Sequence, residues 1–113
     1  MSVTIYHNPN CSKSRATLAL LRERGQEPQI VEYLRHPPTA EELKTILRML
    51  GIGPRELLRP KEAREAGLDD AGLSDDALIA GMLEHPITIE RPIVIAGDRA
   101  RLGRPPEAVL EIL

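Results

Sequence analysis

The start of this 113-residue chain decides its fold class, through residues 3–21, which read VTIYHNPNCSKSRATLALL. Residues 3–7 are rich in β-branched side chains and predict a short buried strand. Residues 12–25 repeat apolar side chains at helical spacing and stop at a glycine, which predicts a helix. A strand, a tight turn and a helix in this order are typical of an α/β fold. The side chains of this helix that we expect to face inward are Leu18, Ala19 and Leu21.

Strands and helices continue to alternate through the middle of the chain. Residues 29–34 predict a second strand, and residues 39–42, Thr-Ala-Glu-Glu, form a capping box that opens an amphipathic helix. In residues 53–72 the helical pattern is interrupted, which predicts one or two short helical turns. Ser74 then caps another helix, which ends near His85-Pro86.

The last part of the chain returns to strands. Residues 91–96 are a β-branched run, and Gly97-Asp98 predicts a hairpin turn into residues 99–102. A C-terminal helix follows, with Pro105-Pro106 in its first turn. The predicted order is βαβα, a helical insertion at about residues 39–86, and then ββα, in one domain that spans the whole chain (residues 1–113).

Composition and charge exclude several classes of function. Lys and Arg number 15 against 17 Asp and Glu, the formal net charge is −2, and only 2% of the residues are aromatic. The interspersed charges form no continuous basic face, and the few aromatic side chains cannot stack on bases, so we expect no nucleic-acid binding. No apolar run is long enough to cross a bilayer and the start lacks signal-peptide features, so we expect a cytoplasmic protein without membrane contact. A single cysteine forms no internal disulfide, which fits a reducing compartment.

Cys11 is the only cysteine, and it lies between the first predicted strand and helix. The unpaired backbone N–H groups of a helix start stabilise an anion, and Lys13, Arg15 and His7 add positive charge. Such surroundings lower the pKa of a thiol, so the position predicts a thiolate nucleophile. The alternative is a buried, inert cysteine. The remaining histidines form no metal-ligand spacing with Cys11, so we expect no metal.

Five other polar residues are candidates for the site. Arg91 precedes a proline at the mouth of a predicted central strand, where a charge is unusual without a ligand. Arg104 starts a helix, where a cation is unfavourable unless an anion binds there. Solvated surface arginines are the alternative for both. His7 either tunes the thiolate or is a hydrogen-bonded structural residue. Ser14 either bonds Cys11 or starts the helix, and Asn8 carries the same ambiguity.

A set of short motifs runs through the whole chain. They are Asn8-Pro9-x-Cys11-x-x-Ser14-Arg15, Tyr33-Leu34 with Pro37-Pro38, Leu57-Leu58-Arg59 with Lys61-Glu62, His85-Pro86, Arg91-Pro92-Ile93-Val94 and Gly103-Arg104-Pro105. Together with the order of elements, they resemble the ArsC family of glutaredoxin-dependent arsenate reductases, in particular its short YfgD-like branch. The resemblance implies a thioredoxin/glutaredoxin-like mixed four-stranded sheet flanked by helices.

The resemblance also implies roles for single residues. Cys11 corresponds to the catalytic cysteine, His7 to the family histidine upstream of it, and Pro92 to the cis-proline that faces the active-site loop. The arginines that correspond to oxyanion ligands are Arg59, Arg91 and Arg104. Guanidinium groups suit a tetrahedral oxyanion because they offer paired, charge-assisted hydrogen bonds, and loop N–H groups between residues 8 and 14 would complete the cradle.

The reaction that the resemblance implies is the reduction of arsenate to arsenite. Cys11 attacks bound arsenate, glutathione as co-substrate reduces the adduct, and glutaredoxin removes the mixed disulfide, with no bound cofactor. Because the chain has one cysteine, the reducing thiols come from outside. Two alternatives stay open, namely a thioredoxin-fold regulator similar to Spx, which contacts RNA polymerase, and a glutathione-linked thiol reductase acting on another oxyanion.

Overall fold

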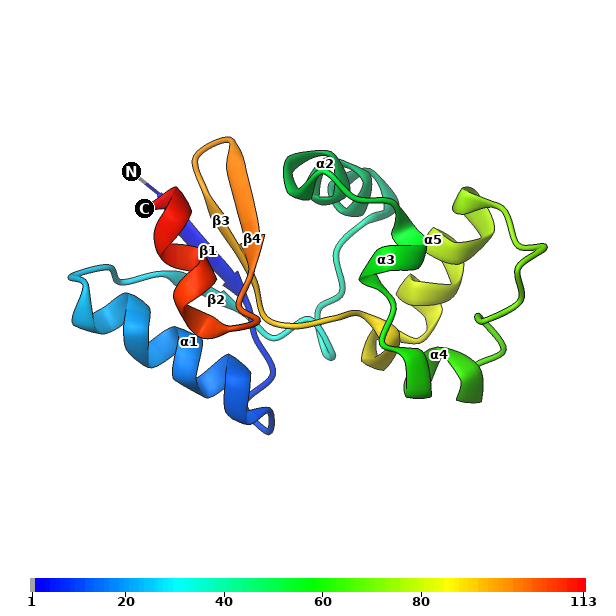
Figure 1. Ribbon diagram of the computed structural model, residues 1–113, viewed down its shortest axis with the longest axis horizontal. Coiled ribbons are helices and arrows are strands. Elements are labelled where there is room, and N and C mark those ends of the chain that lie inside the picture. Colours follow the sequence, from blue (N-terminus) through cyan, green and yellow to red (C-terminus); the bar gives the residue numbers. More distant parts are fainter. Residues whose placement is uncertain (1) are drawn as a thin grey trace. The chain divides into compact units, whose positions relative to one another are not determined.

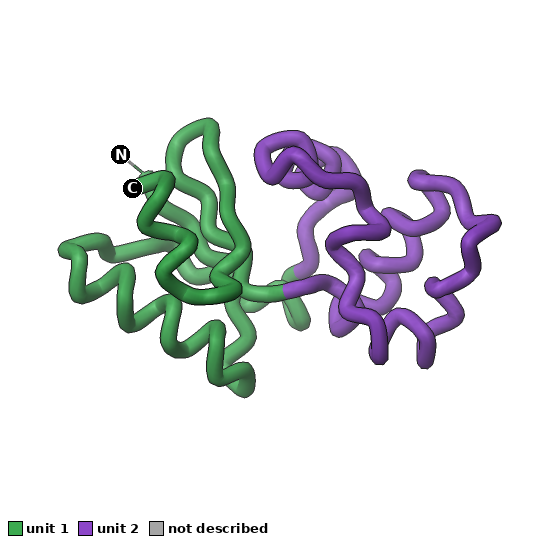
Figure 2. The backbone as a smooth tube through the Cα atoms, viewed as in Figure 1, with its two compact units in different colours: residues 1–36, 91–113 green, residues 37–90 purple. Residues whose placement is uncertain are grey.

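The structure is a computed structural model that describes residues 2–113. The chain forms two compact units, which Figure 2 colours green and purple. The first unit joins the residues up to His36 with residues 91–113, and the second unit is residues 37–90. The helical insertion predicted at about residues 39–86 lies within the second unit.

The first unit is built on a sheet of four strands. Its elements are β1 (Val3–Tyr6), α1 (Ser12–Glu23), β2 (Gln29–Val31), β3 (Ile93–Ala96), β4 (Arg99–Leu102) and the 3₁₀ helix η2 (Pro106–Ile112) (Figure 1). The strand order is β2-β1-β3-β4, with β1 and β2 parallel and the other neighbouring pairs antiparallel. The mixed four-stranded sheet flanked by helices confirms the predicted fold class.

The core of the first unit lies between one face of this sheet and two helices. Alternate side chains point to the same face of a strand, so β1 and β3 each contribute every second residue to the core. Ile5 and Leu21 are fully buried, and each such burial is worth about 1.5–3 kcal/mol. The cluster contains Val3 and Ile5 of β1, Leu18 and Leu21 of α1, Val94 and Ala96 of β3, and Val109 and Ile112 of η2.

Ala19 was expected to face inward, and this expectation is wrong. The buried positions of α1 are Ser14, Thr17, Leu18 and Leu21, which follow the three- and four-residue spacing of one helix face. Ala19 is exposed because the helical period turns it to the far side of the helix. The polar Ser14 and Thr17 lie on the buried face in its place.

Several predicted boundaries also differ from the structure, three of them for clear physical reasons. The second strand stops at Val31 instead of residue 34, because the chain turns directly afterwards. β3 begins at Ile93 instead of residue 91, since the preceding Pro92 has no N–H group for a ladder. Pro105 precedes η2 with extended backbone angles, φ −72° and ψ 166°, instead of lying in its first turn. The proline that follows it disfavours the helical region there.

The second unit is helical. Its elements are α2 (Ala40–Leu50), α3 (Pro54–Leu57), α4 (Pro60–Glu65), α5 (Asp75–Glu84) and the 3₁₀ helix η1 (Pro86–Thr88). The predicted capping box is confirmed, because the Thr39 hydroxyl accepts a hydrogen bond from the Glu42 N–H and the Glu42 carboxylate accepts one from the Thr39 N–H. Ser74 caps α5 in the predicted way, by accepting from the Ala77 N–H. The apolar faces of α2 and α5 supply much of this unit's core.

A short backbone pairing holds two distant segments of the second unit together. Leu58 and Ile89 form an antiparallel bridge. On either side of it, the Arg59 N–H donates to the Thr88 carbonyl at 2.8 Å and the Glu90 N–H donates to the Leu57 carbonyl at 2.8 Å. Arg59 and Glu90 therefore lie on facing segments.

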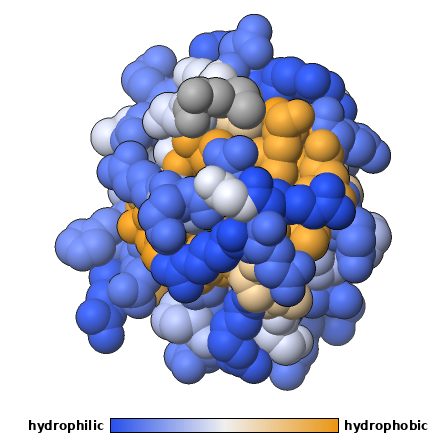
Figure 3. Space-filling model, turned by 90° about the vertical axis from the view of Figure 1, so that its left-hand side faces the viewer, coloured by the Kyte–Doolittle hydropathy of each residue, from blue (hydrophilic) through white to orange (hydrophobic). Residues whose placement is uncertain are grey.

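The side of the molecule in Figure 3 is mostly hydrophilic, with one larger apolar area. Among the described residues, the exposed large apolar side chains are Ile30, Leu34 and Ile87. Within residues 2–113, no helix has both the length and the apolar character needed to cross a bilayer.

Replacing Thr39 by Ala should lower the free energy of unfolding by about 1 kcal/mol, since the first turn of α2 loses its hydroxyl cap. Urea denaturation followed by circular dichroism measures this change. Thr45→Ala is the matched control, because Thr45 is an exposed residue inside the same helix and Ala is the better helix former. Equal stability losses for the two variants would contradict the role of the cap.

Candidate active site

Cys11 occupies the N-cap position of α1. Its backbone is extended, with φ −101° and ψ 122°, and its carbonyl accepts the N–H of Arg15 at 3.0 Å. The backbone N–H groups of Lys13 and Ser14 lower the pKa of the thiol, although the side chain makes no capping hydrogen bond of ordinary geometry. The side chain is partly exposed. Cys11 thus lies at a helix start, where the first N–H groups have no carbonyl partner within the helix and can stabilise a negative charge on the sulfur atom.

The loop before Cys11 is fixed by its own hydrogen bonds. The Cys11 N–H donates to the Asn8 carbonyl at 3.0 Å, which closes a turn. The Asn8 side chain is buried, and its Oδ1 accepts the Asn10 N–H at 3.0 Å. Nη1 of Arg15 donates to the Pro9 carbonyl at 2.8 Å. Asn8 and Arg15 therefore shape the loop, through contacts that the sequence motif alone did not reveal.

His7 and Ser14 connect the end of β1 to the first turn of α1. Nδ1 of His7 lies 2.6 Å from Oγ of Ser14, and the same Oγ accepts the Asn8 N–H at 3.1 Å. Burial lowers the pKa of His7, Arg15 and Arg22 lower it further, and Glu32 acts in the opposite direction. In a neutral His7, Nδ1 accepts a hydrogen bond from the Ser14 hydroxyl when the proton is on Nε2 and donates one when the proton is on Nδ1. The Ser14 hydroxyl thus hydrogen-bonds His7, while the Ser14 backbone N–H lowers the pKa of the thiol.

Two guanidinium groups lie beside the sulfur atom. Nη2 of Arg104 is 3.9 Å from the Cys11 Sγ, and Nε of Arg104 donates to the Arg91 carbonyl at 2.8 Å. Arg91 is only 9% exposed, and its side chain hydrogen-bonds the thiol. The Arg91–Pro92 peptide bond is cis, the geometry expected for Pro92. Both arginines therefore direct positive charge at Cys11.

Opposing effects act on the pKa of Cys11, and the balance lies below the ordinary value of a thiol. Burial alone raises it. The N–H of Ser14, the hydrogen bond and charge of Arg91, and the N–H of Lys13 lower it by more. These groups stabilise the thiolate, so Cys11 is a stronger acid than a free cysteine and a ready nucleophile.

Gly103 allows Arg104 to approach the site. Its N–H donates to the Pro92 carbonyl at 3.0 Å. A Cβ atom at this position would clash with the Thr17 side chain and lie 2.7 Å from Pro92 Cγ. Only glycine fits between α1 and this proline. Sequence reasoning missed Gly103, although it directly precedes Arg104 in the motif that was singled out.

Arg59 belongs to the second unit, whereas the other predicted site residues belong to the first. Its Nη1 is 2.9 Å from Glu90 Oε1, and its Nε is 3.3 Å from Glu62 Oε1. These two carboxylate partners were not predicted. The three-residue spacing between Arg59 and Glu62 on a helix start was the available signal. The role of Arg59 stays a prediction.

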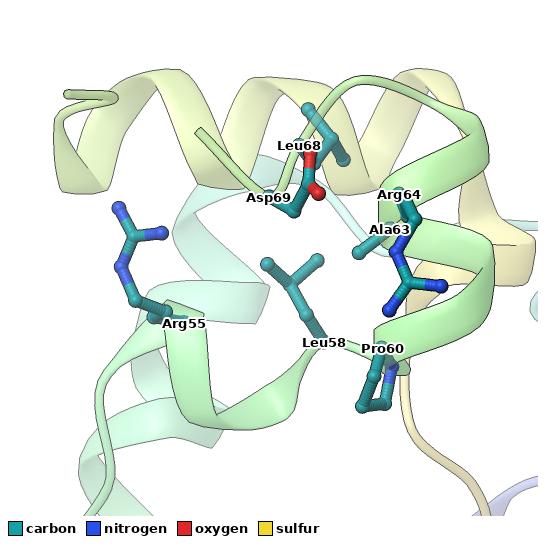
Figure 4. Close-up of a pocket in the computed structure, with 7 residues that line it drawn as sticks. All are labelled: Arg55, Leu58, Pro60, Ala63, Arg64, Leu68 and Asp69. Carbon is teal, nitrogen blue, oxygen red and sulfur yellow. The ribbon is translucent and has the colours of Figure 1, made fainter. Parts of the chain in front are cut away.

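The second unit also contains a pocket of about 280 Å³ with no predicted site residue in it. Figure 4 shows Leu58 pointing into it from one side and Leu68 from the other, with Arg55 and Arg64 at its edges. Arg55 is bound to backbone carbonyls, those of Asp70 and Leu73.

In the described part of the chain, no group of three or more His, Cys, Asp or Glu side chains is arranged to hold a metal ion.

Replacing Arg91 by Ala should raise the pKa of Cys11, because the thiolate loses a hydrogen bond and a positive charge. The rate of alkylation follows the thiolate fraction, so it rises as the pH increases through this pKa and then levels off. The rise should occur at higher pH in Arg91→Ala than in the wild type. Arg99→Ala is the control, since Arg99 is exposed on β4. Identical pH profiles for wild type and Arg91→Ala would contradict the assignment.

Replacing Gly103 by Ala should move Arg104 away from Cys11 and slow alkylation of the thiol at neutral pH. Gly97→Ala is the control. Gly97 has φ +64° in the hairpin turn, so its replacement strains the backbone without touching the site. Alkylation kinetics and thermal unfolding separate the two effects. Unchanged reactivity in a folded Gly103→Ala protein would show that Arg104 does not depend on this glycine.

Comparisons with known proteins agree with the resemblance found in the sequence. The ArsC family pattern matches residues 6–112. The chain is 51% identical to the arsenate reductase of Haemophilus influenzae, over all of both chains, and 54% identical to the Escherichia coli protein called uncharacterized protein YfgD, over 98% of this chain and 96% of that one. The solved arsenate reductase from Vibrio cholerae is 57% identical and superposes with a TM-score of 0.96, covering 100% of this chain and 98% of that chain. The chain belongs to the ArsC family.

Proposed function

We propose that this chain reduces arsenate to arsenite with Cys11 as the nucleophile. The observation that carries the proposal is the convergence of Arg91, Arg104 and two backbone N–H groups on the Cys11 thiol. Several relatives at about half sequence identity over the length of this chain are named arsenate reductase, which supports the choice of substrate.

The site suits a tetrahedral oxyanion for physical reasons. A guanidinium group donates two parallel hydrogen bonds to neighbouring oxygens and keeps its charge at all relevant pH values. The donors that stabilise the thiolate can also hold oxyanion oxygens next to it. Such an arrangement brings nucleophile and electrophile together and reduces the repulsion between two anions.

The first step forms a bond between Cys11 Sγ and arsenic and breaks one As–OH bond. The departing hydroxide takes a proton and leaves as water, so arsenic stays pentavalent. Glutathione then supplies the second thiol. Two electrons pass to arsenic, the sulfur–arsenic bond breaks, and arsenite leaves as the two sulfur atoms join in a Cys11–glutathione disulfide.

Regeneration requires a thiol from outside the chain, because Cys11 is the only cysteine in it. We propose glutaredoxin as that partner. Its thiolate attacks the glutathione sulfur of the mixed disulfide, and Cys11 leaves as a thiolate. A leaving group with a lowered pKa departs more readily, so the groups that activate Cys11 for attack also assist its release. This cycle uses no bound cofactor and fits the reducing conditions of the cytoplasm.

The remaining predicted residues take supporting roles in this proposal. His7 and Ser14 hold the first turn of α1 so that its N–H groups face the sulfur atom. Asn8 maintains the loop before Cys11. Arg59 is proposed as a third oxyanion ligand because it matches the family motif, and its pairing with Glu62 and Glu90 then has to be shared with or replaced by the oxyanion.

The test is arsenate-dependent oxidation of NADPH by the purified chain with glutathione, glutaredoxin and glutathione reductase. Wild type should turn over only when glutathione and glutaredoxin are both present. Cys11→Ser should be inactive, because serine is not ionised at neutral pH. Arg91→Ala should lose about 100-fold in kcat/KM, as expected when a charged contact to the reacting group is removed. Arg99→Ala should keep wild-type activity.

Residual turnover in Cys11→Ser would contradict the role of the nucleophile. A wild-type chain with an acidic thiol but no turnover of arsenate would leave Cys11 as a nucleophile and contradict the substrate.

A further inference from the structure

Thr17 is a buried polar side chain of α1 that the proposed function does not use. It is 0% exposed and lies on the same face of the helix as Ser14, Leu18 and Leu21. Burying a hydroxyl group costs free energy unless the group is hydrogen-bonded. The partner of this hydroxyl therefore decides what Thr17 can do.

The partner is the backbone carbonyl of Lys13, one helical turn earlier. The Thr17 hydroxyl donates to it at 2.8 Å. Gly103 packs closely against Thr17, since a Cβ atom at residue 103 would clash with the Thr17 Oγ1. A β-branched side chain also has few rotamers. The hydroxyl is therefore held on the Lys13 carbonyl.

The Lys13 carbonyl and the Ser14 N–H belong to one planar peptide group. A hydrogen bond accepted by the carbonyl oxygen polarises this group and makes its N–H a stronger donor, by roughly 10–30%. The burial of the Thr17 side chain keeps water away from the bond, which is stronger in such surroundings than in water. The Thr17 hydroxyl thus acts on the N–H of Ser14.

This N–H is one of the two that serve the N-cap of α1. Ser14 is the third residue of the helix, and Cys11 is its N-cap. The N–H groups of the second and third residues of a helix are the ones that an N-cap side chain meets. Among the groups that lower the pKa of Cys11, the Ser14 N–H acts most strongly. A change in the donor strength of this N–H therefore changes the stability of the thiolate.

Helix α2 contains the same arrangement with a different N-cap. The Thr45 hydroxyl donates to the Glu41 carbonyl at 3.0 Å. The N–H of the same peptide group is that of Glu42, and it donates to the N-cap hydroxyl of Thr39 at 3.1 Å. Thr45 and Thr17 each lie six residues after their N-cap. In α1, the N-cap side chain served by this arrangement is a thiol instead of a hydroxyl.

Resting on the proposed role of Cys11 as the nucleophile, we propose that Thr17 is a positioning residue that stabilises the Cys11 thiolate through the Lys13–Ser14 peptide group. Its hydroxyl holds and polarises the carbonyl end of this group, and the N–H end then stabilises more negative charge on the sulfur atom. Arg91 acts on the thiol with a full charge, whereas Thr17 acts from inside the helix without one. The inference holds whichever oxyanion is the substrate.

The charged and titratable groups near Cys11 stay the same when Thr17 is replaced. They are Arg91 and Arg104 from the C-terminal part of the chain, His7 from the end of β1, and Lys13 and Arg15 from α1. A change in the ionisation of Cys11 therefore reports on the hydroxyl hydrogen bond and not on a lost or added charge.

The test measures alkylation of Cys11 by iodoacetamide as a function of pH, in the full chain with Thr17→Val. This variant keeps the β-branched shape and removes the hydroxyl donor. The profile should move to higher pH, and below the pKa the rate should fall about twofold, because the thiolate loses part of one charge-assisted hydrogen bond. Thr17→Ser keeps the hydroxyl and should behave like the wild type. Thr45→Val is the matched control, since it removes the same type of bond from a helix without a cysteine, and it should leave the profile unchanged.

A second variant covers the case in which valine disturbs the fold. Thr17→Ala also removes the hydroxyl, without crowding Gly103, and should show the same change. Thermal unfolding shows which variants remain folded. A wild-type pH profile in a folded variant that lacks the hydroxyl would overturn the proposal. An equal change in Thr17→Ser would also overturn it, since the shape of the side chain and not its hydroxyl would then be the cause.

Alkylation needs no arsenate, so this inference and the proposed function can fail separately. If wild-type Cys11 ionises like a free cysteine, the activated nucleophile fails together with the role of Thr17. If wild-type Cys11 is acidic and the Thr17 variants match it, only the role of Thr17 fails. If the variants differ as expected and the wild type does not turn over arsenate, the inference stands and the substrate is wrong.

Discussion

The stabilisation of one thiolate at the start of α1 is the interaction on which the candidate site depends. A helix start provides N–H donors without partners in the helix, and here two of them, from Lys13 and Ser14, lower the pKa of the Cys11 thiol. Burial raises the pKa of Cys11, and the hydrogen bond and charge of Arg91 act in the opposite direction. The thiol is therefore acidic because of the groups around it. The same donors are suited to an oxyanion substrate.

The rest of the first unit holds these groups in place. The hydrogen bond between His7 and Ser14 ties the end of β1 to α1, and the core side chains fix α1 on the sheet. β3 and β4 bring two arginines from the C-terminal part of the chain to the sulfur. Gly103 permits this approach because any larger side chain would clash with Thr17 and Pro92. A small β-sheet with an aliphatic core thus provides a rigid frame for a charged site.

Much of this could be predicted from the sequence, for identifiable reasons. Periodicity, the Thr39–Glu42 capping box and the Ser74 cap located most elements, and the position of Cys11 between a strand and a helix indicated the lowered pKa of its thiol. Ala19 was misplaced because a local apolar pattern does not show which helix face the sheet will cover. The 3₁₀ form of η2 and the extended Pro105 depend on packing and on two successive prolines. The partners of Arg59 escaped prediction because Glu90 is distant in sequence and meets Arg59 only through a single bridge.

The most direct test of the account is to trap the Cys11–glutathione disulfide by mass spectrometry. The purified chain is incubated with arsenate and glutathione, without glutaredoxin, and the modified peptide is identified. The account predicts one glutathione on Cys11 that appears only when arsenate is present and is removed when glutaredoxin is added. A chain that stays unmodified, or that gains glutathione equally without arsenate, would contradict the claim that Cys11 reduces a bound oxyanion.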